Sequence, residues 1–282
     1  MDRESCGMNG RGGHNSVSES VSLPSLRIIT LVDLESFTED EDLDPDSFGD
    51  NADLDGQNEV MEQEDQDRLL NFWQDVGRGH AIDIPQDMAQ PIQQLTTDME
   101  NTPVREKVPF TLVTHEKCDN VPYEKRVYQR AFWACVTMQN DTYEQSICAG
   151  FMKLMRYICQ HNTLGSYLGM TVPIVTVVRT DETRTALSRA VTVAYHLPCH
   201  HQHQPPIPAD PDITIETWPV TVAYARSFSG PTSESSILRE INAFSEVLDP
   251  LEVSVSDSFI VAGYTSLAAT HRHNEVWFLE RL

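Results

Sequence analysis

The stretch YEQSICAGFMKLMRYICQHN, residues 143 to 162, decides the fold, because its apolar side chains recur with the period of an α-helix. Charged and polar residues such as Lys153, Arg156 and Gln160 occupy the remaining surface. The apolar side chains fall within one arc of roughly 160° on a helical wheel: Ile147, Cys148, Phe151, Met152, Leu154, Met155, Ile158 and Cys159. A helix with one apolar face must cover a sheet or another helix.

Short β-rich segments flank this helix, and the same order recurs after the Pro-rich break QPPIPADPD (204–212). A second helix, SESSILREINAFSEVL (233–248), places Ile237, Ile241, Phe244 and Leu248 on one face, with Ser233 as its N-cap. The predicted strands are FTLVTHE (110–116), YEKRVY (123–128), AFWACVTM (131–138), the stretch LGMTVPIVTVV (168–178), RAVTVAYHLP (189–198), ITIETW (213–218), VTVAYARSF (220–228), FIVAGYTSL (259–267) and NEVWFLE (274–280).

Two copies of strand, strand, helix, strand, strand predict an α+β fold. We expect a distorted antiparallel β-barrel of two β-β-α-β-β pseudo-repeats, closed or nearly closed, with two helices on its surface. Gly165 and Gly169 let the chain leave the first helix tightly, and Pro173 fits the beginning of the next strand.

The acidic charge is concentrated before this body. Residues 1–107 hold 25 acidic against 7 basic residues, whereas the rest of the chain holds 18 against 13. High charge and few large apolar groups predict that residues 1–104 form a largely disordered tail and that a single domain spans 105–282. Two apolar islands interrupt the tail, LRIITLVDL (26–34) and an amphipathic helix at 65–77. The helix fits either packing on the domain's own surface or docking of a protein partner.

Composition excludes several classes of partner. A net acidic chain offers no concentrated basic face for nucleic acid or anionic membrane. No stretch approaches the roughly 20 apolar residues of a membrane span. The six cysteines form no CxxC motif or regular framework, which favours a reducing compartment. We therefore expect a soluble, cytoplasmic protein.

Motifs for catalysis and metal binding are absent from the sequence. It contains no P-loop, GxGxxG, GxSxG, HExxH or CxxCH, and no residue set supports an enzyme. The histidines of CHHQHQPP (199–206) lie in a Pro-rich loop, and we interpret them as solvated rather than as a metal site. Glu275 and Glu280 on the last strand are interpreted in the same way, as side chains of a solvated edge.

The first helix carries the candidate binding site. Met152, Met155, Cys159 and Arg156 border its wide apolar arc. A groove of this kind suits a flat apolar ligand with carboxylates, whose ring packs on Phe151 and Met155 while Arg156 or Lys153 pairs with the acid groups. The alternative is that a Met-rich helix face is ordinary core.

Six motifs, in order and spacing, resemble the SOUL family of haem-binding proteins over residues 108 to 282, and within it the heme-binding protein 2 branch. They are YEKRVYQRAFWACV (123–136), FMKLMRYICQHN (151–162), LGMTVPI (168–174), YARSFSG (224–230), AGYTSL (262–267) and NEVWFLE (274–280).

The resemblance implies a distorted barrel with pseudo-twofold duplication and non-covalent, exchangeable binding of haem or a porphyrin beside the first helix. By position, the groove would involve Cys148, Phe151, Met155 and Arg156, near the loop leading into Met170, and Met152 lies at the same border. Arg156 would suit the propionates, and Cys148 stands where relatives can carry a basic residue. The implied function is that of a carrier, buffer or sensor; the alternative is a protein-interaction scaffold that acts through the acidic tail without significant haem affinity.

Overall fold

The computed structural model describes residues 83–94, 105–118, 120–230, 232–251, 253–264 and 273–281, together with three single positions, 71, 74 and 78. The expected segment at 26–34 lies outside these residues, and the expected helix at 65–77 lies largely outside them. The division of the chain at residues 104 and 105 stays a prediction.

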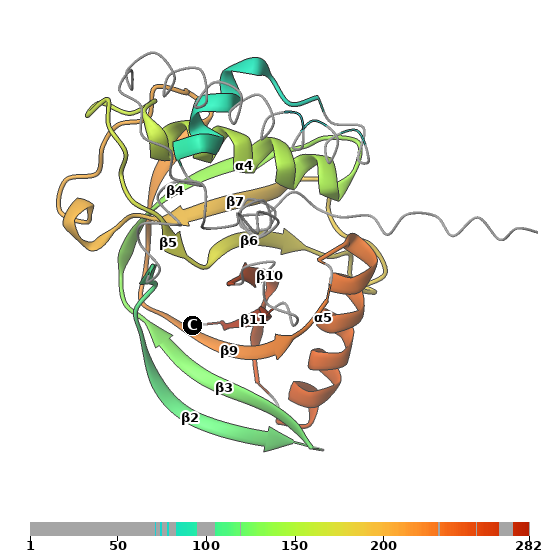
Figure 1. Ribbon diagram of the computed structural model, residues 1–282. Coiled ribbons are helices and arrows are strands. Elements are labelled where there is room, and N and C mark those ends of the chain that lie inside the picture. Colours follow the sequence, from blue (N-terminus) through green and yellow to red (C-terminus); the bar gives the residue numbers. More distant parts are fainter. Residues whose placement is uncertain are drawn as a thin grey trace, which may run out of the picture.

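The first half of the fold places one long helix between strands, as the hydrophobic periodicity predicts (Figure 1). The helix begins after Thr142, whose hydroxyl accepts a hydrogen bond from the Gln145 amide, and it ends at Cys159, slightly before the expected end at residue 162. The elements are β1 (Glu106–Lys107), β2 (Phe110–Cys118), β3 (Val121–Tyr128), β4 (Ala131–Met138), α4 (Tyr143–Cys159), β5 (Thr171–Val172), β6 (Ile174–Arg179) and β7 (Val191–His196).

The second half repeats this order. The hydroxyl of Ser233 accepts a hydrogen bond from the Ser236 amide, so the predicted N-cap is confirmed. The elements are the 3-10 turn η2 (Cys199–His201), β8 (Ile213–Trp218), β9 (Thr221–Phe228), α5 (Glu234–Leu248), η3 (Asp249–Leu251), β10 (Val255–Gly263) and β11 (Asn274–Glu280).

The strands form one nine-stranded sheet in the order β2-β3-β9-β11-β10-β6-β7-β4-β8, and every pairing in it is antiparallel. The strands of the two repeats correspond in pairs: β3 with β8, β4 with β9, β6 with β10 and β7 with β11. If each strand is replaced by its counterpart, the order from β3 to β8 is reversed and every strand keeps equivalent neighbours. The pseudo-twofold axis therefore passes between β6 and β10, in agreement with the repeat expected from the sequence. The sheet is strongly curled, and β2 and β8 stand at opposite ends of the pairing order.

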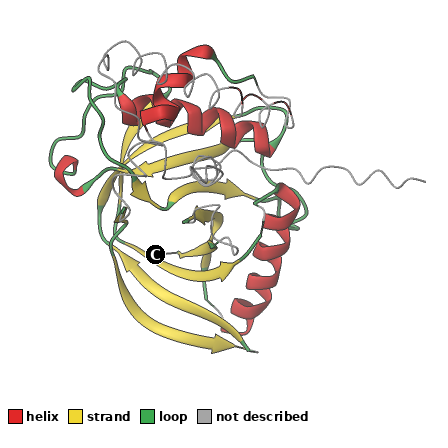
Figure 2. Cartoon of the chain, viewed as in Figure 1, coloured by secondary structure: helices red, strands yellow, loops and turns green. Residues whose placement is uncertain are grey.

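The two helices pack on the convex side of this curled sheet, as Figure 2 shows. A Cβ added at Gly150 of α4 would lie 2.8 Å from Val193 Cγ2 on β7 and 3.2 Å from Met138 Cγ on β4, so this side of α4 lies directly on the sheet. A large buried cluster fills the space between the helices and the sheet, and a second cluster lies on the concave side.

The last strand is not at an edge, contrary to the interpretation from the sequence. β11 lies between β9 and β10, and Glu275 is only 2% exposed. The sequence suggested a solvated strand because chain order does not reveal strand order. A buried carboxylate needs a partner, and Glu275 has one in Arg126.

Two further expectations concern membranes and cysteines. Among the described residues, no helix is long and apolar enough to cross a membrane. The cysteines at 118, 135, 148, 159 and 199 are free thiols.

Candidate functional site

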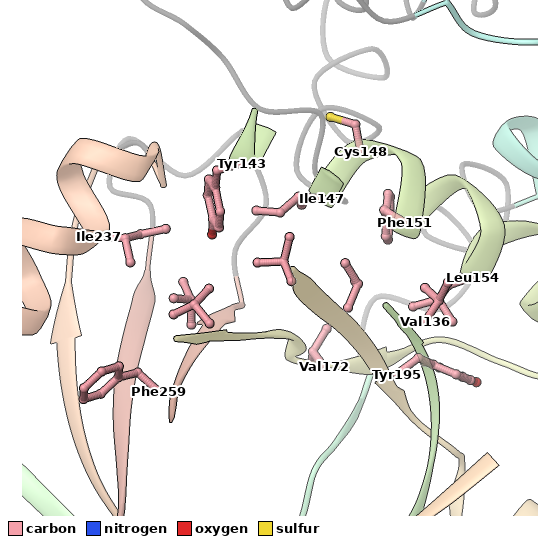
Figure 3. Packing of buried hydrophobic residues seen from close by; sticks show 14 of the residues in the cluster. Val136, Tyr143, Ile147, Cys148, Phe151, Leu154, Val172, Tyr195, Ile237 and Phe259 are labelled. Carbon is pink, nitrogen blue, oxygen red and sulfur yellow. The ribbon is translucent and has the colours of Figure 1, made fainter. Parts of the chain in front are cut away.

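Helix α4 has a second apolar face on the side away from the sheet. With 3.6 residues per turn, Cys148, Met155 and Cys159 lie opposite Gly150, and Met152 lies beside them. We call these four residues the outer stripe. Figure 3 shows the Cys148 thiol on the other side of the helix from Ile147, which points into the core.

Cys148, Met155 and Cys159 are nevertheless buried and Met152 is partly buried, because residues 83–94 lie over the outer stripe. This covering segment comprises η1 (Gln86–Met88) and a helical stretch at 89–94, and Figure 1 shows it running above α4. Ile84, Met88 and Ile92 are buried in the same cluster as α4. The Cys159 thiol donates to the Pro91 carbonyl oxygen at 3.5 Å. Part of the expected tail therefore packs on the domain.

Most side chains predicted for the site belong to one large buried cluster, which also contains core residues of both helices and the sheet. Phe151 packs on the sheet side of the outer stripe, and Met170, just before β5, joins the cluster from outside the helix. Arg156 stands at the rim, where its Nη2 donates to Asp87 Oδ1 of the covering segment at 2.9 Å. The members of this buried cluster among the predicted residues are Cys148, Phe151, Met155 and Met170, with Met152 partly buried against it.

The two cations proposed for the ligand's carboxylates, Lys153 and Arg156, lie three residues apart on the same side of α4. Lys153 Nζ donates to Asp210 Oδ2 at 2.7 Å and to Asp212 Oδ2 at 2.9 Å. Arg156 has a single carboxylate partner in the described part of the chain, Asp87, whose side chain is 59% exposed. Lys153 is therefore held by two ion pairs and Arg156 by one.

A second apolar site, which the sequence did not predict, lies on the concave face. A cavity of about 610 Å³, here called the chamber, is lined by residues of most strands of the sheet. Trp133 and Trp218 stack with ring centroids 4.4 Å apart, and Tyr128 and Trp277 stack at 4.7 Å. The signal in the sequence is that AFWACVTM and NEVWFLE are apolar on both faces, which indicates strands buried on both sides.

A buried ion pair closes one part of the concave face. Arg126 Nη1 and Nη2 donate to the two carboxylate oxygens of Glu275 at 2.7 and 2.8 Å, and the Tyr264 hydroxyl and the Trp277 indole also donate to Glu275. Burial opposes ionisation, but hydrogen bonds from His273 and Arg126 outweigh it and lower the pKa of Glu275 to about 2. This carboxylate is a fully engaged structural group.

His196 lines the chamber and is 3% exposed. Its Nδ1 has no hydrogen-bond partner among the described residues. Burial lowers the pKa of His196 to about 4, so the imidazole is neutral at pH 7. Among the residues that the structure describes, no group of three or more His, Cys, Asp or Glu side chains comes close enough to hold a metal ion.

These elements define an α+β domain built on a curled antiparallel sheet. The chain belongs to the SOUL heme-binding protein family, whose sequence model matches residues 105–279.

Curated relatives support this membership. "Heme-binding protein 1" of Xenopus laevis is 26% identical over 170 residues, which cover 60% of this chain and 89% of the relative. "Heme-binding protein 2" of Homo sapiens is 27% identical over 161 residues, which cover 56% and 78%. Among solved structures, the EcmrR C-terminal domain has a TM-score of 0.42 at 9% identity and covers 60% of this chain and all of that chain. That likeness is too remote to bear on function.

Proposed function

We propose that this protein binds haem or a related tetrapyrrole, without covalent attachment, on the outer stripe of α4. The observation that carries the proposal is the second apolar face of this helix, which points away from the sheet and carries Arg156 at its rim. The family and the names of its relatives support haem as the ligand.

The residues of the outer stripe fit such a ligand. Methionine side chains adapt to a flat ring, and Met152 and Met155 supply them here. A propionate would take the place of the Asp87 carboxylate on Arg156, which presents a planar fork of donors. The thiol and thioether sulfurs of the stripe are groups that can approach iron.

Binding on this face requires the covering segment to leave. Ile84, Met88 and Ile92 occupy the apolar surface that the ring would use, so ligand and segment compete for it. The apparent affinity is then reduced by the fraction of molecules in which the stripe is covered. A site of this kind binds exchangeably, as a cytoplasmic carrier, buffer or sensor of haem does, and it performs no reaction.

The test is a haemin titration of the full chain followed by Soret absorbance. Asp87→Asn removes the competing carboxylate, so in that background Arg156→Gln reports only the contact with the ligand. We expect saturable one-to-one binding that Arg156→Gln weakens by about two- to fivefold, the range of a solvent-accessible ion pair. Lys153→Gln in the same background is the matched control, because Lys153 is held by Asp210 and Asp212. Binding that does not saturate, or that responds equally to both variants, contradicts the proposal.

A further inference from the structure

The chamber on the concave face is lined mainly by large aromatic residues. Protein interiors leave few voids larger than a water molecule. A space of about 610 Å³ lined by two stacked aromatic pairs has the size and lining of a small-molecule site.

His196 is a buried polar group in the wall of this apolar space. The Gln202 side-chain amide accepts from the Phe132 amide at 2.7 Å and donates to the carbonyl oxygens of Phe132 and Leu197 at 3.1 and 2.6 Å. These contacts use both protons of its NH2 group, which lies 3.5 Å from His196 Nε2. His196 Nδ1 has almost no exposed surface, so the polar contacts of a ligand in the chamber fall to the charged side chains that line it.

The charges that line the chamber are unequally engaged. Glu106 Oε1 accepts from the Cys199 amide at 2.8 Å, and Glu216 Oε2 accepts from the Trp218 indole at 3.3 Å. Arg130 and Arg179 also line the chamber and are exposed. Neither guanidinium has an ion-pair partner in the described part of the chain. The opening of the chamber therefore offers positive charge that an anionic ligand can neutralise.

We propose that the chamber is a second binding site, which takes a planar aromatic carboxylate. The ring lies against the stacked tryptophan and tyrosine walls, and the carboxylate meets Arg130 and Arg179. This site is on the opposite face of the sheet from α4. It does not depend on haem binding at the outer stripe.

The site is tested with 2-naphthoate on the full chain by calorimetry. Tryptophan fluorescence is a second readout, because three of the four tryptophans line the chamber. We expect saturable one-to-one binding in both readouts.

The aromatic walls and the opening of the chamber are tested by substituting residues that are exposed or half-buried, because such substitutions preserve folding. Trp218→Ala should weaken 2-naphthoate about tenfold or more, because it removes half of one stacked pair. The double variant Arg130→Gln/Arg179→Gln should weaken 2-naphthoate binding by about tenfold. Arg239 lies on α5 and is 69% exposed, so Arg239→Gln is the control and should leave the affinity unchanged. The absence of saturable naphthoate binding, or binding indifferent to Trp218→Ala, overturns the proposal. Arg156→Glu should affect haemin and not naphthoate, so the two sites fail independently.

Discussion

Glu275 shows how a single residue stabilises the concave face. Its pair with Arg126 is buried on both sides, with side chains 3% and 8% exposed. Glu275→Gln leaves the guanidinium with Glu124 as its remaining counter-charge, 2.7 Å from Nε. Breaking a buried pair with no other partner costs about 3–5 kcal/mol, so we expect a loss near the lower end, about 3 kcal/mol. Glu280→Gln is the matched control, because Glu280 lies on the same strand and its pair with Lys125 is about 30% exposed; we expect a loss below about 1 kcal/mol. Urea unfolding compares the two, and equal losses would contradict the structural role of Glu275.

His196 should make stability depend on pH. Its pKa is about 4 when folded and 6.5 in the reference state, so between these values the unfolded chain binds the extra proton. Stability is therefore complete above pH 6.5 and falls as the pH drops towards 4. Between pH 7 and 5 the loss from this residue is about 2 kcal/mol. Urea unfolding at both pH values should show a smaller loss for His196→Phe than for the natural sequence. An unchanged difference would mean that His196 is accessible to protons.

At the scale of the elements, the join between α4 and the sheet depends on Gly150. Alanine there gains about 1 kcal/mol of helix propensity, but its Cβ would lie 2.8 Å from Val193 Cγ2. Overpacking of this kind costs about 1–3 kcal/mol, so we expect Gly150→Ala to lower the free energy of unfolding by about 1 kcal/mol. Val193→Ala alone should also lower the free energy of unfolding. The double variant Gly150→Ala/Val193→Ala should lose less stability than the sum of the two single losses, because the smaller side chain at 193 makes room for the new Cβ. Additive losses would show that Gly150 and Val193 do not contact.

The elements themselves could be predicted from the sequence, because period and turn residues are local. The helix at Tyr143–Cys159 and the Ser233 cap followed from spacing alone. Spacing could not tell which half of the wide α4 arc faces the sheet, since Ile147 and Met155 are equally apolar. The neighbours of β11 could not be predicted either, because position in the chain does not determine position in a sheet. This last strand lies between β9 and β10, inside the sheet.

At the scale of the whole molecule, both sites depend on contacts between distant parts of the chain. The covering segment reaches α4 from more than 50 residues away, and the acidic composition around it predicted disorder. The chamber takes only a few residues from each strand, so no single segment reveals it. Cys148, Phe151 and Met155 could be placed near one another from the sequence because they share one helix, and their role as a binding site stays a prediction.

Competition between ligand and covering segment predicts variants that bind more tightly. Met88 is fully buried in the cluster. Truncating such a side chain costs about 2–5 kcal/mol of packing energy, and this loss weakens the docking of the covering segment on α4. Met88→Ala should therefore raise haemin affinity more than tenfold, and Asp87→Asn should raise it by up to about fivefold. Gln86→Ala, on the exposed side of the same turn, is the control. Soret titrations that show weaker binding for Met88→Ala would place the ligand elsewhere.

The most direct measurement is amide hydrogen exchange of the full chain with and without haemin. If the ligand takes the outer stripe, amides of residues 86–94 should exchange faster when haemin is bound, because the segment loses its docking surface. Amides of α4 should stay protected. Unchanged exchange in 86–94, together with new protection in β4, β7 and β8, would contradict binding on the outer stripe and place the tetrapyrrole in the chamber.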